Sequence, residues 1–220
     1  MVIEGLLGSS IDEKNIELAK ILFSLRHDLD VHCLIGLNTS QIEQTGQGKF
    51  FFGHVQRRVL DSIILAICKV YEDEKGYELN SIQGVINSLA KNNATPPMSE
   101  QSVRDFVREY GGPSEERDSS KALRSTVDLL KNKYAEDLKR FKTARDKVVA
   151  HSEYQAMIKT VPSFDCMEKL FEFGADFYGA VSHSFIGCGP DDLRKRREVK
   201  RDFCKLLKAI GVKDIKTEME

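Results

Sequence analysis

Four residues near the end of a long stretch without glycine carry side chains suited to phosphate chemistry. Arg145, Asp146, Lys147 and His151 supply a permanent cation, a carboxylate, a second cation and a group that titrates near neutral pH. RNA cleavage needs a base for the proton of a 2′-hydroxyl or an acid for the leaving oxygen, together with positive charge on the phosphate. A histidine suits the proton transfer and an arginine fork suits the phosphate, and no metal is needed where the 2′-hydroxyl is itself the nucleophile.

Helix geometry limits how these groups act together. Arg145 and His151 are six residues apart, so on one helix they point roughly 120° apart and lie about 9 Å apart along the axis. A compact site would form if two copies of the helix crossed and pooled their side chains, so a catalytic interpretation predicts a homodimer. The alternative is that both residues are solvated or locally paired charges on an amphipathic helix, with Asp146 bound to a cation one turn away.

The elements that position these residues are predicted from apolar residues that recur every three or four positions. No segment shows sustained strand alternation, so the sequence predicts an all-α bundle of about five long and two short helices. Residues 119–154 contain neither glycine nor proline and are predicted to form one long helix. The predicted helices span residues 11–37, 49–71, 80–90, 99–110, 119–154, 163–185 and 190–210.

Several boundaries of these helices are predicted from individual residues. Gly76 is expected to end the apolar helix over 49–71, which belongs at the centre of the bundle. Ser99 is expected to cap the helix over 99–110, and Gly111-Gly112-Pro113 to stop it. The whole chain is predicted to be one domain over 1–220.

The last predicted helix is strongly basic on one side. Arg194, Arg197 and Arg201 are candidate RNA contacts, as is Lys147 beside the motif. An ordinary solvated helix face is the favoured alternative, because nearby acidic residues dilute the positive field. The apolar stripe that would turn the charges toward water is predicted to comprise Leu193, Val199, Phe203, Leu206 and Ile210.

The segment ARDKVVAHSE, which contains Arg145 and His151, resembles the signature of the HEPN superfamily. Its residues are similar to those of the AbiU2-type abortive-infection branch. That signature is an Arg, usually followed by a polar residue, and a His after about four to six intervening positions late on a bundle helix. The upstream stretch RRVLDSIILAICKVYEDEKGYELNSIQGVINSL is similar to the central helix of the same branch. The resemblance extends from about residue 50 to residue 181, which defines the predicted HEPN-like core.

The resemblance implies a helical bundle that dimerises through its motif helices and acts as a metal-independent endoribonuclease in a toxin or phage-defence system. Arg145 would then hold the scissile phosphate, His151 would transfer or orient a proton, and Asp146 would orient one of them. RNA is the implied substrate, and an antitoxin is a further implied partner. Other HEPN proteins are inactive modules that bind RNA or a protein, and this alternative stays open.

One departure concerns the tyrosine that some HEPN toxins carry two residues after the histidine, where a partner nucleotidyltransferase modifies it. That position is Glu153 here, and Tyr154 comes one residue later. The resemblance therefore does not extend to control by that modification.

Composition excludes several other classes of protein. The 220 residues carry a formal net charge of −1, which excludes a globally basic nucleic-acid binder, and 41% hydrophobic residues exclude a disordered tail. The longest apolar run, residues 62–68, is far shorter than the ~20 residues that span a bilayer. With no signal peptide pattern and five cysteines in no paired spacing, we expect a cytoplasmic protein with reduced thiols and neither metal nor cofactor.

Overall fold

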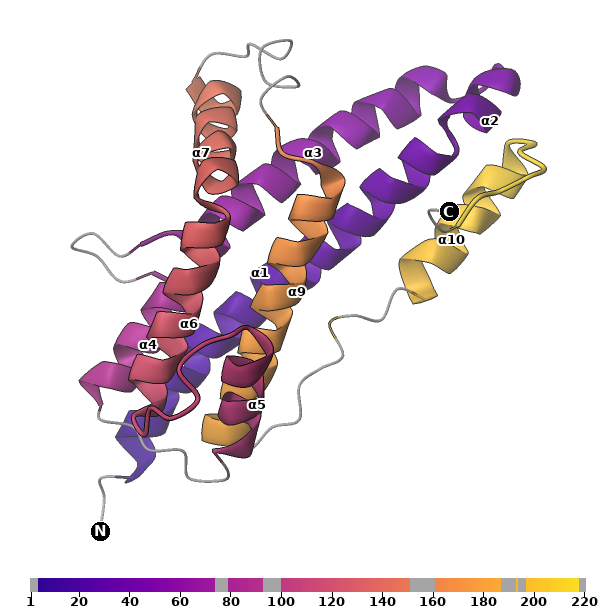
Figure 1. Cartoon of the computed structure of the whole chain (residues 1–220). Coiled ribbons are helices and arrows are strands. Elements are labelled where there is room, and N and C mark those ends of the chain that lie inside the picture. Colours follow the sequence, from indigo (N-terminus) through magenta and orange to yellow (C-terminus); the bar gives the residue numbers. More distant parts are fainter. Residues whose placement is uncertain are drawn as a thin grey trace.

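The computed structural model describes residues 4–73, 79–92, 100–150, 161–186, 193 and 197–217. This part of the chain contains helices and no strand, which confirms the predicted all-α class (Figure 1). The helices are α1 (Glu4–Leu37), α2 (Thr39–Gln44), α3 (Lys49–Tyr71), α4 (Ile82–Lys91), α5 (Gln101–Glu109), α6 (Ser119–Lys133), α7 (Ala135–Ala150), α9 (Phe164–Val181) and α10 (Arg197–Ala209), with a π-helical turn over Ser182–Ile186.

Helices α1 and α3 form a long antiparallel pair that is the spine of the molecule (Figure 1). The short helix α2, which the sequence analysis does not predict, turns the chain between them. Leu18 and Leu22 of α1 and Ile63 and Ile67 of α3 are fully buried in one continuous core. From Ile63 to Tyr71, α3 buries apolar side chains on most of its circumference, so this half of the helix lies at the centre of the bundle, as its sequence predicts. Before Ile63 most of its side chains are exposed or half-buried.

The predicted single helix over 119–154 is wrong in one respect, because the chain breaks at Tyr134 into α6 and α7. No glycine or proline marks the break. Helix α6 packs against α4 and α5, whereas α7 packs against α3, and these two targets do not lie along one straight line (Figure 1). With no local signal for the break, we attribute it to the different packing partners of the two helices.

Helices α4, α6 and α9 begin at side-chain caps. Ser81 accepts a hydrogen bond from the backbone N–H of Gly84 at 3.1 Å, and Ser163 accepts one from Cys166 at 3.2 Å. Asp118 accepts hydrogen bonds from Ser120 and Lys121 ahead of α6, and the bonds from Ser120 hold the pKa of this carboxyl below its ordinary value. These bonds satisfy backbone donors that the first helical turn leaves free.

Two predicted boundary residues can be compared with the observed ends of α3 and α5. Helix α3 ends at Tyr71, where Glu72 becomes extended, and the Gly76 expected to end it lies outside the described residues. Helix α5 begins at Gln101 without a side-chain cap, and Ser99 also lies outside the described residues. Gly112 lies where α5 ends against α6, and a Cβ added there would sit 2.0 Å from a side-chain oxygen of α6, so only glycine fits.

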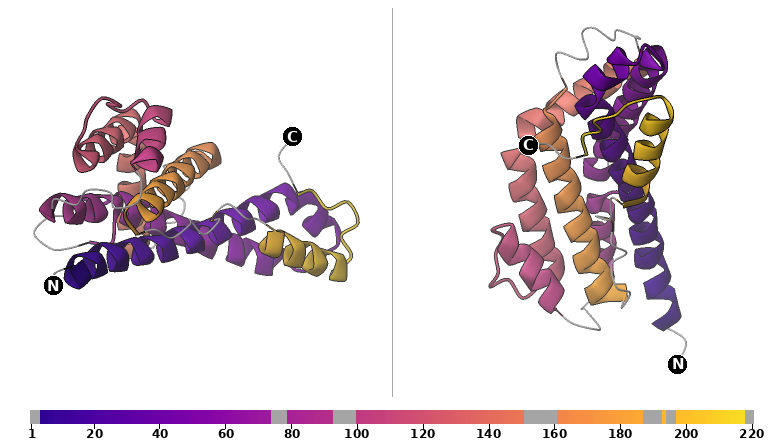
Figure 2. Two further views of the ribbon diagram at one scale, coloured as in Figure 1. Left: turned by 90° about the horizontal axis from the view of Figure 1, so that it is seen from below. Right: turned by 90° about the vertical axis from the view of Figure 1, so that its right-hand side faces the viewer.

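Helix α10 lies at the end of the α1–α3 pair farthest from α4, α5 and α6, as both views of Figure 2 show. Phe203 and Leu207 insert into a second apolar cluster with Phe52 of α3. Leu206 is 44% exposed, so the predicted apolar stripe is wrong at that position. The buried seam runs from Phe203 to Leu207, four residues on, so both lie on one face of α10.

The chain after α10 is held in place by Asn38, at the junction of α1 and α2. Its amide donates to the carbonyl of Lys216, and its carbonyl accepts from the Lys216 N–H, both at 2.8 Å. The same amide also donates to Leu34. This fully buried side chain therefore fixes the C-terminal segment against the tip of the spine.

Candidate functional site

The predicted motif lies in the last turns of α7, and two buried residues of that helix hold it against the core. Phe141 and Ala144 are completely buried against α3. Arg145 follows Ala144 directly, so its side chain emerges at the edge of the α3–α7 contact, half-buried, and Asp146 points to solvent. The motif therefore starts where the buried face of α7 meets its exposed face.

Arg145 lies between two carboxylates. Its Nε donates a hydrogen bond of 3.0 Å to Oδ1 of Asp146, and its Nη1 lies 3.6 Å from Oε1 of Glu72. The hydrogen bond to Asp146 raises the pKa of Arg145 above its already high value, so the guanidinium is permanently charged. The side chain is 30% exposed, and these two contacts use only part of the five N–H donors of a guanidinium.

Asp146 therefore contacts Arg145, one of the two residues that the resemblance would have it orient. Its side chain is 67% exposed, and its partner is the adjacent residue rather than a cation one turn away. Lys147 is half-buried at the same helix end. His151 lies outside the described residues, so the structure brings Arg145 and Asp146 together and leaves the Arg145–His151 separation open.

Glu72 is a site residue that the sequence analysis misses. It follows Tyr71, the last residue of α3, and belongs to the acidic turn that forms part of the resemblance. Its charge gives a weak signal, because four acidic residues lie within the segment YEDEKGYE. Only the crossing of α3 and α7 places this particular carboxylate beside Arg145.

Cys68 lies one helical turn before Glu72 on the same face of α3. Burial raises the pKa of its thiol to about 11, and the nearby charge of Arg145 opposes that rise. Cys68 is therefore a neutral thiol near pH 7, the form in which a cysteine is a weak nucleophile. The four described cysteines, Cys33, Cys68, Cys166 and Cys204, are all free thiols, as predicted for these residues.

The basic last helix lies far from this site within one chain. Arg201 is on α10, is 62% exposed and donates to Asp202 at 3.2 Å. Helix α10 contacts Phe52 near the start of α3, sixteen residues or about 24 Å along the helix from Cys68. The side chains of Arg194 and Arg197 lie outside the described residues. A single chain therefore does not bring Arg201 to Arg145.

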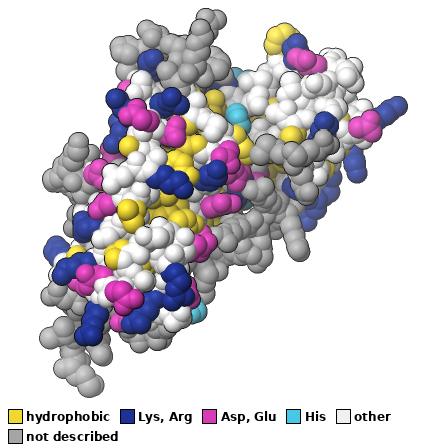
Figure 3. Space-filling view, viewed as in Figure 1, with side chains coloured by type: hydrophobic (Ala, Val, Ile, Leu, Met, Phe, Trp, Pro, Cys, Tyr) yellow, Lys and Arg dark blue, Asp and Glu magenta, His cyan; other side chains and the backbone are white. Residues whose placement is uncertain are grey.

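The described surface has a mixed character. Apolar side chains gather in the strip between α6–α7 and α9, and basic and acidic side chains flank it (Figure 3). Within the described residues no three His, Cys, Asp or Glu side chains converge as metal ligands. The same residues include no helix long and apolar enough to cross a bilayer.

Comparison with known proteins assigns the chain to a family. The AbiU2 family of HEPN proteins matches residues 10–201, which extends the resemblance beyond residues 50–181 at both ends and includes α1. This extension agrees with the packing, because α1 is the main partner of α3 in the core. Searches of curated proteins and of solved structures each found no match. The family matches most of the chain, and the motif lies late on a bundle helix. This chain therefore belongs to the AbiU2 family of HEPN proteins.

Proposed function

We propose that this protein is a metal-independent endoribonuclease of a phage-defence or toxin system, with Arg145 and His151 as its reacting groups. The observation that carries the proposal is Arg145 itself, a permanently charged and partly open guanidinium at the end of α7. Family membership supports the defence role. In the proposed reaction Arg145 stabilises the charge that develops on the phosphate, and His151 handles the proton of the 2′-hydroxyl or of the leaving oxygen.

The first experiment measures RNA cleavage in the presence of a metal chelator. Total RNA is incubated with the wild-type protein, Arg145→Ala and His151→Ala. Arg140→Ala is the matched control, because Arg140 lies on the same helix, is 60% exposed and pairs with Asp137. Cleavage by the wild type and Arg140→Ala alone supports the proposal. Equal RNA decay in all four preparations would show a contaminating nuclease and eliminate it.

We propose that the active form is a homodimer whose clefts combine Arg145 of one chain with His151 of the other. The six-residue spacing supports this, since on a single helix the two side chains point in different directions and lie about 9 Å apart along the axis. Mixing the inactive Arg145→Ala and His151→Ala proteins tests it directly. After subunit exchange half of the dimers are mixed, each with one intact cleft of two, so about a quarter of the wild-type activity should return. No recovery after proven exchange contradicts a shared cleft.

The alternative function is a module that binds RNA or a protein partner, such as an antitoxin, without cutting. The observation in its favour is the pair of carboxylates, Asp146 and Glu72, that already contact Arg145. This alternative predicts saturable RNA binding that weakens with salt and yields no products. Under that function Lys147, Arg194, Arg197 and Arg201 would contribute phosphate contacts, and the loss of each would weaken RNA binding.

A further inference from the structure

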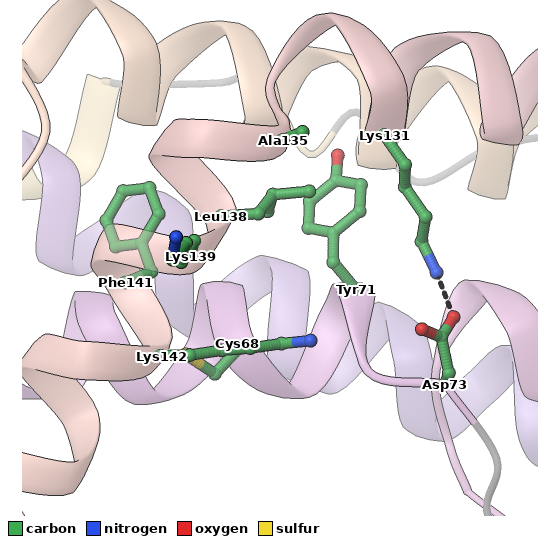
Figure 4. A pocket seen from close by; sticks show the side chains of 9 residues that line it. All are labelled: Cys68, Tyr71, Asp73, Lys131, Ala135, Leu138, Lys139, Phe141 and Lys142. Atoms are coloured by element: carbon green, nitrogen blue, oxygen red, sulfur yellow. Dashed lines mark hydrogen bonds and ion pairs between the residues drawn. The ribbon is translucent and has the colours of Figure 1, made fainter.

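A cavity of about 290 Å³ lies between the end of α3 and the α6–α7 junction (Figure 4). Its volume is at the lower end of the ~300–1,000 Å³ typical of ligand sites. Tyr71, Leu138, Phe141 and Cys68 supply apolar walls. The Tyr71 hydroxyl donates to the carbonyl of Leu170 at 2.5 Å, which fixes the ring, and the Cys68 thiol is neutral near pH 7. The walls are therefore rigid, partly aromatic and uncharged.

Positive charge surrounds the mouth of this cavity. Lys131, Lys139 and Lys142 line it together with a single carboxylate, that of Asp73, so three cations face one anion. Lys131 is bound to Asp73 and is only 16% exposed, whereas Lys139 and Lys142 are exposed (Figure 4). In the part of the chain that the structure describes, neither of these two pairs with a carboxylate. An apolar cavity with two available ammonium groups suits a planar ring attached to phosphate.

The cavity adjoins the candidate catalytic residues on two elements. Lys142 precedes Arg145 by three residues on α7, so both lie on one side of the helix, about 4.5 Å apart along its axis. On the other element, Glu72 contacts Arg145 and the next residue, Asp73, contacts Lys131. A nucleotide whose ring occupies the cavity would therefore place its phosphates along Lys142 and Arg145.

We propose that this cavity binds the base of an RNA nucleotide next to the phosphate held by Arg145. The apolar walls favour a base because a base has a flat face that can pack against them. The half-buried Leu138 offers most of that surface, since the rings of Tyr71 and Phe141 are almost fully buried. Lys131 and Asp73 offer a donor and an acceptor to the edge of that base, and Lys139 and Lys142 hold its backbone. This inference rests on the proposed function, since it assigns the cavity to the same RNA strand.

The test measures binding without cleavage. A short fluorescent RNA with 2′-O-methyl groups cannot supply the 2′-hydroxyl nucleophile, and its affinity is measured by anisotropy beside the same strand with one abasic position. Leu138→Trp fills the cavity from a half-buried position. Leu129→Trp is the matched control, because Leu129 is 48% exposed on α6 and does not line the cavity. The four nucleoside monophosphates are titrated separately.

The proposal expects Leu138→Trp to weaken binding of the full strand about tenfold, or ~1.4 kcal/mol, while Leu129→Trp binds as wild type. The abasic strand should bind both variants equally. Lys142→Gln should weaken both strands, with Lys20→Gln on α1 as its charge control. Equal affinity of wild type and Leu138→Trp for the full strand would overturn the proposal. So would tight binding of a free nucleotide that Leu138→Trp abolishes while strand binding is unchanged.

Cleavage of the unmodified strand is followed in parallel and separates the two proposals. Base-dependent binding without any cleavage would retain the cavity as a base site and reject the nuclease. Cleavage that depends on Arg145 but is the same in Leu138→Trp and in Leu129→Trp would retain the nuclease and reject the base site.

Discussion

Two arginines of this protein each lie between two carboxylates, Arg26 inside the bundle and Arg145 at its edge. Arg26 binds Asp30 at 2.6 Å and both oxygens of Glu168 at 2.9 and 3.0 Å, which ties α1 to α9. It also lies over the ring of Phe171, 4.9 Å from the centroid. The exposed fraction of its side chain is 3%, against 30% for Arg145.

The difference teaches how the surroundings of a cation separate structure from function. The fork of Arg26 is occupied by oxygens of Asp30 on its own helix and of Glu168 on α9, and its side chain is almost fully buried. Its pKa is raised by Glu168 and Asp30, which together outweigh the cost of burial. Arg145 has one good hydrogen bond and one longer ion pair, so a phosphate can compete for it. Two arginines with the same kind of neighbours therefore differ in role: Arg26 joins two helices, whereas Arg145 is accessible to a ligand.

The largest expected effect is on stability, from Arg26→Met. This change leaves Asp30 and Glu168 without their cation in a buried place, so we expect the free energy of unfolding to fall by about 3–5 kcal/mol. Urea denaturation measures it. Arg58→Met is the control, because Arg58 is 72% exposed and its ion pair is 3.9 Å long, and it should cost less than about 0.5 kcal/mol. If Arg26→Met lowered the free energy of unfolding as little as Arg58→Met, Arg26 would not have the structural role that distinguishes it from Arg145.

The second effect is on cleavage, from Arg145→Lys. Lysine keeps the charge and loses the planar fork, so we expect single-turnover cleavage to slow about 10- to 100-fold. The free energy of unfolding should change by less than about 1 kcal/mol, because the ion pairs of Arg145 are partly exposed. Arg140→Lys on the same helix should change neither quantity. A stability loss as large as that of Arg26→Met would assign Arg145 a structural role.

The third effect is on RNA affinity, from Glu72→Gln. A carboxylate 3.6 Å from a guanidinium in water contributes about 1 kcal/mol, and its removal frees Arg145 for phosphate. We therefore expect about fivefold tighter binding of a non-cleavable RNA at low salt, and a smaller gain at high salt. Glu172→Gln, an exposed change on α9, is the control. Weaker binding would show that Glu72 positions Arg145 rather than competing for it.

The smallest effect uses the thiol of Cys68 as a probe of the charge on Arg145. Arg145 lowers the pKa of Cys68, which burial raises to about 11. We therefore expect Arg145→Ala to raise that pKa further and to slow alkylation of Cys68 at pH 10 about two- to threefold. Arg26→Met should leave this rate alone once the protein is confirmed to be folded. Mass spectrometry of the labelled peptide gives the rate, and faster labelling in Arg145→Ala would indicate exposure instead.

The same thiol predicts how stability depends on pH. Its pKa is about 11 in the folded protein and near the ordinary value of 9.0 in the unfolded chain. The unfolded state therefore loses its proton first, so the free energy of unfolding should fall as pH rises from about 9 to about 11. Below pH 9 this contribution is fully present. Cys68→Ala should show a shallower fall in urea melts over the same range.

Local patterns were enough to predict most helices and the start of the site. Periodicity and capping residues gave α3 its bounds at Lys49 and Tyr71 and placed α4, α5 and α9 within about two residues at their starts. The motif predicted that Arg145 and Asp146 lie late on a bundle helix. These predictions held because helix formation and capping depend on neighbours within four residues.

Other features escaped the sequence because they depend on distant segments. The break at Tyr134 carries no breaking residue, and Leu206 satisfies the helical period as well as Leu207 does. Glu72 is one acidic residue among several, and the cavity beside Tyr71 has walls from α3, α6 and α7. Each of these features depends on which helix packs against it in the folded protein.

By itself, the sequence determined the helical class, the family and the residue types of the site, because these follow from local spacing and a short motif. Only the tertiary structure decided that Arg26 is enclosed and Arg145 accessible. Both arginines have an acidic residue close by in sequence, Asp30 four positions after one and Asp146 directly after the other. What separates them is the second carboxylate, which comes from a distant segment. Glu168 on α9 lies against a buried guanidinium, whereas Glu72 at the end of α3 leaves the other partly open to solvent.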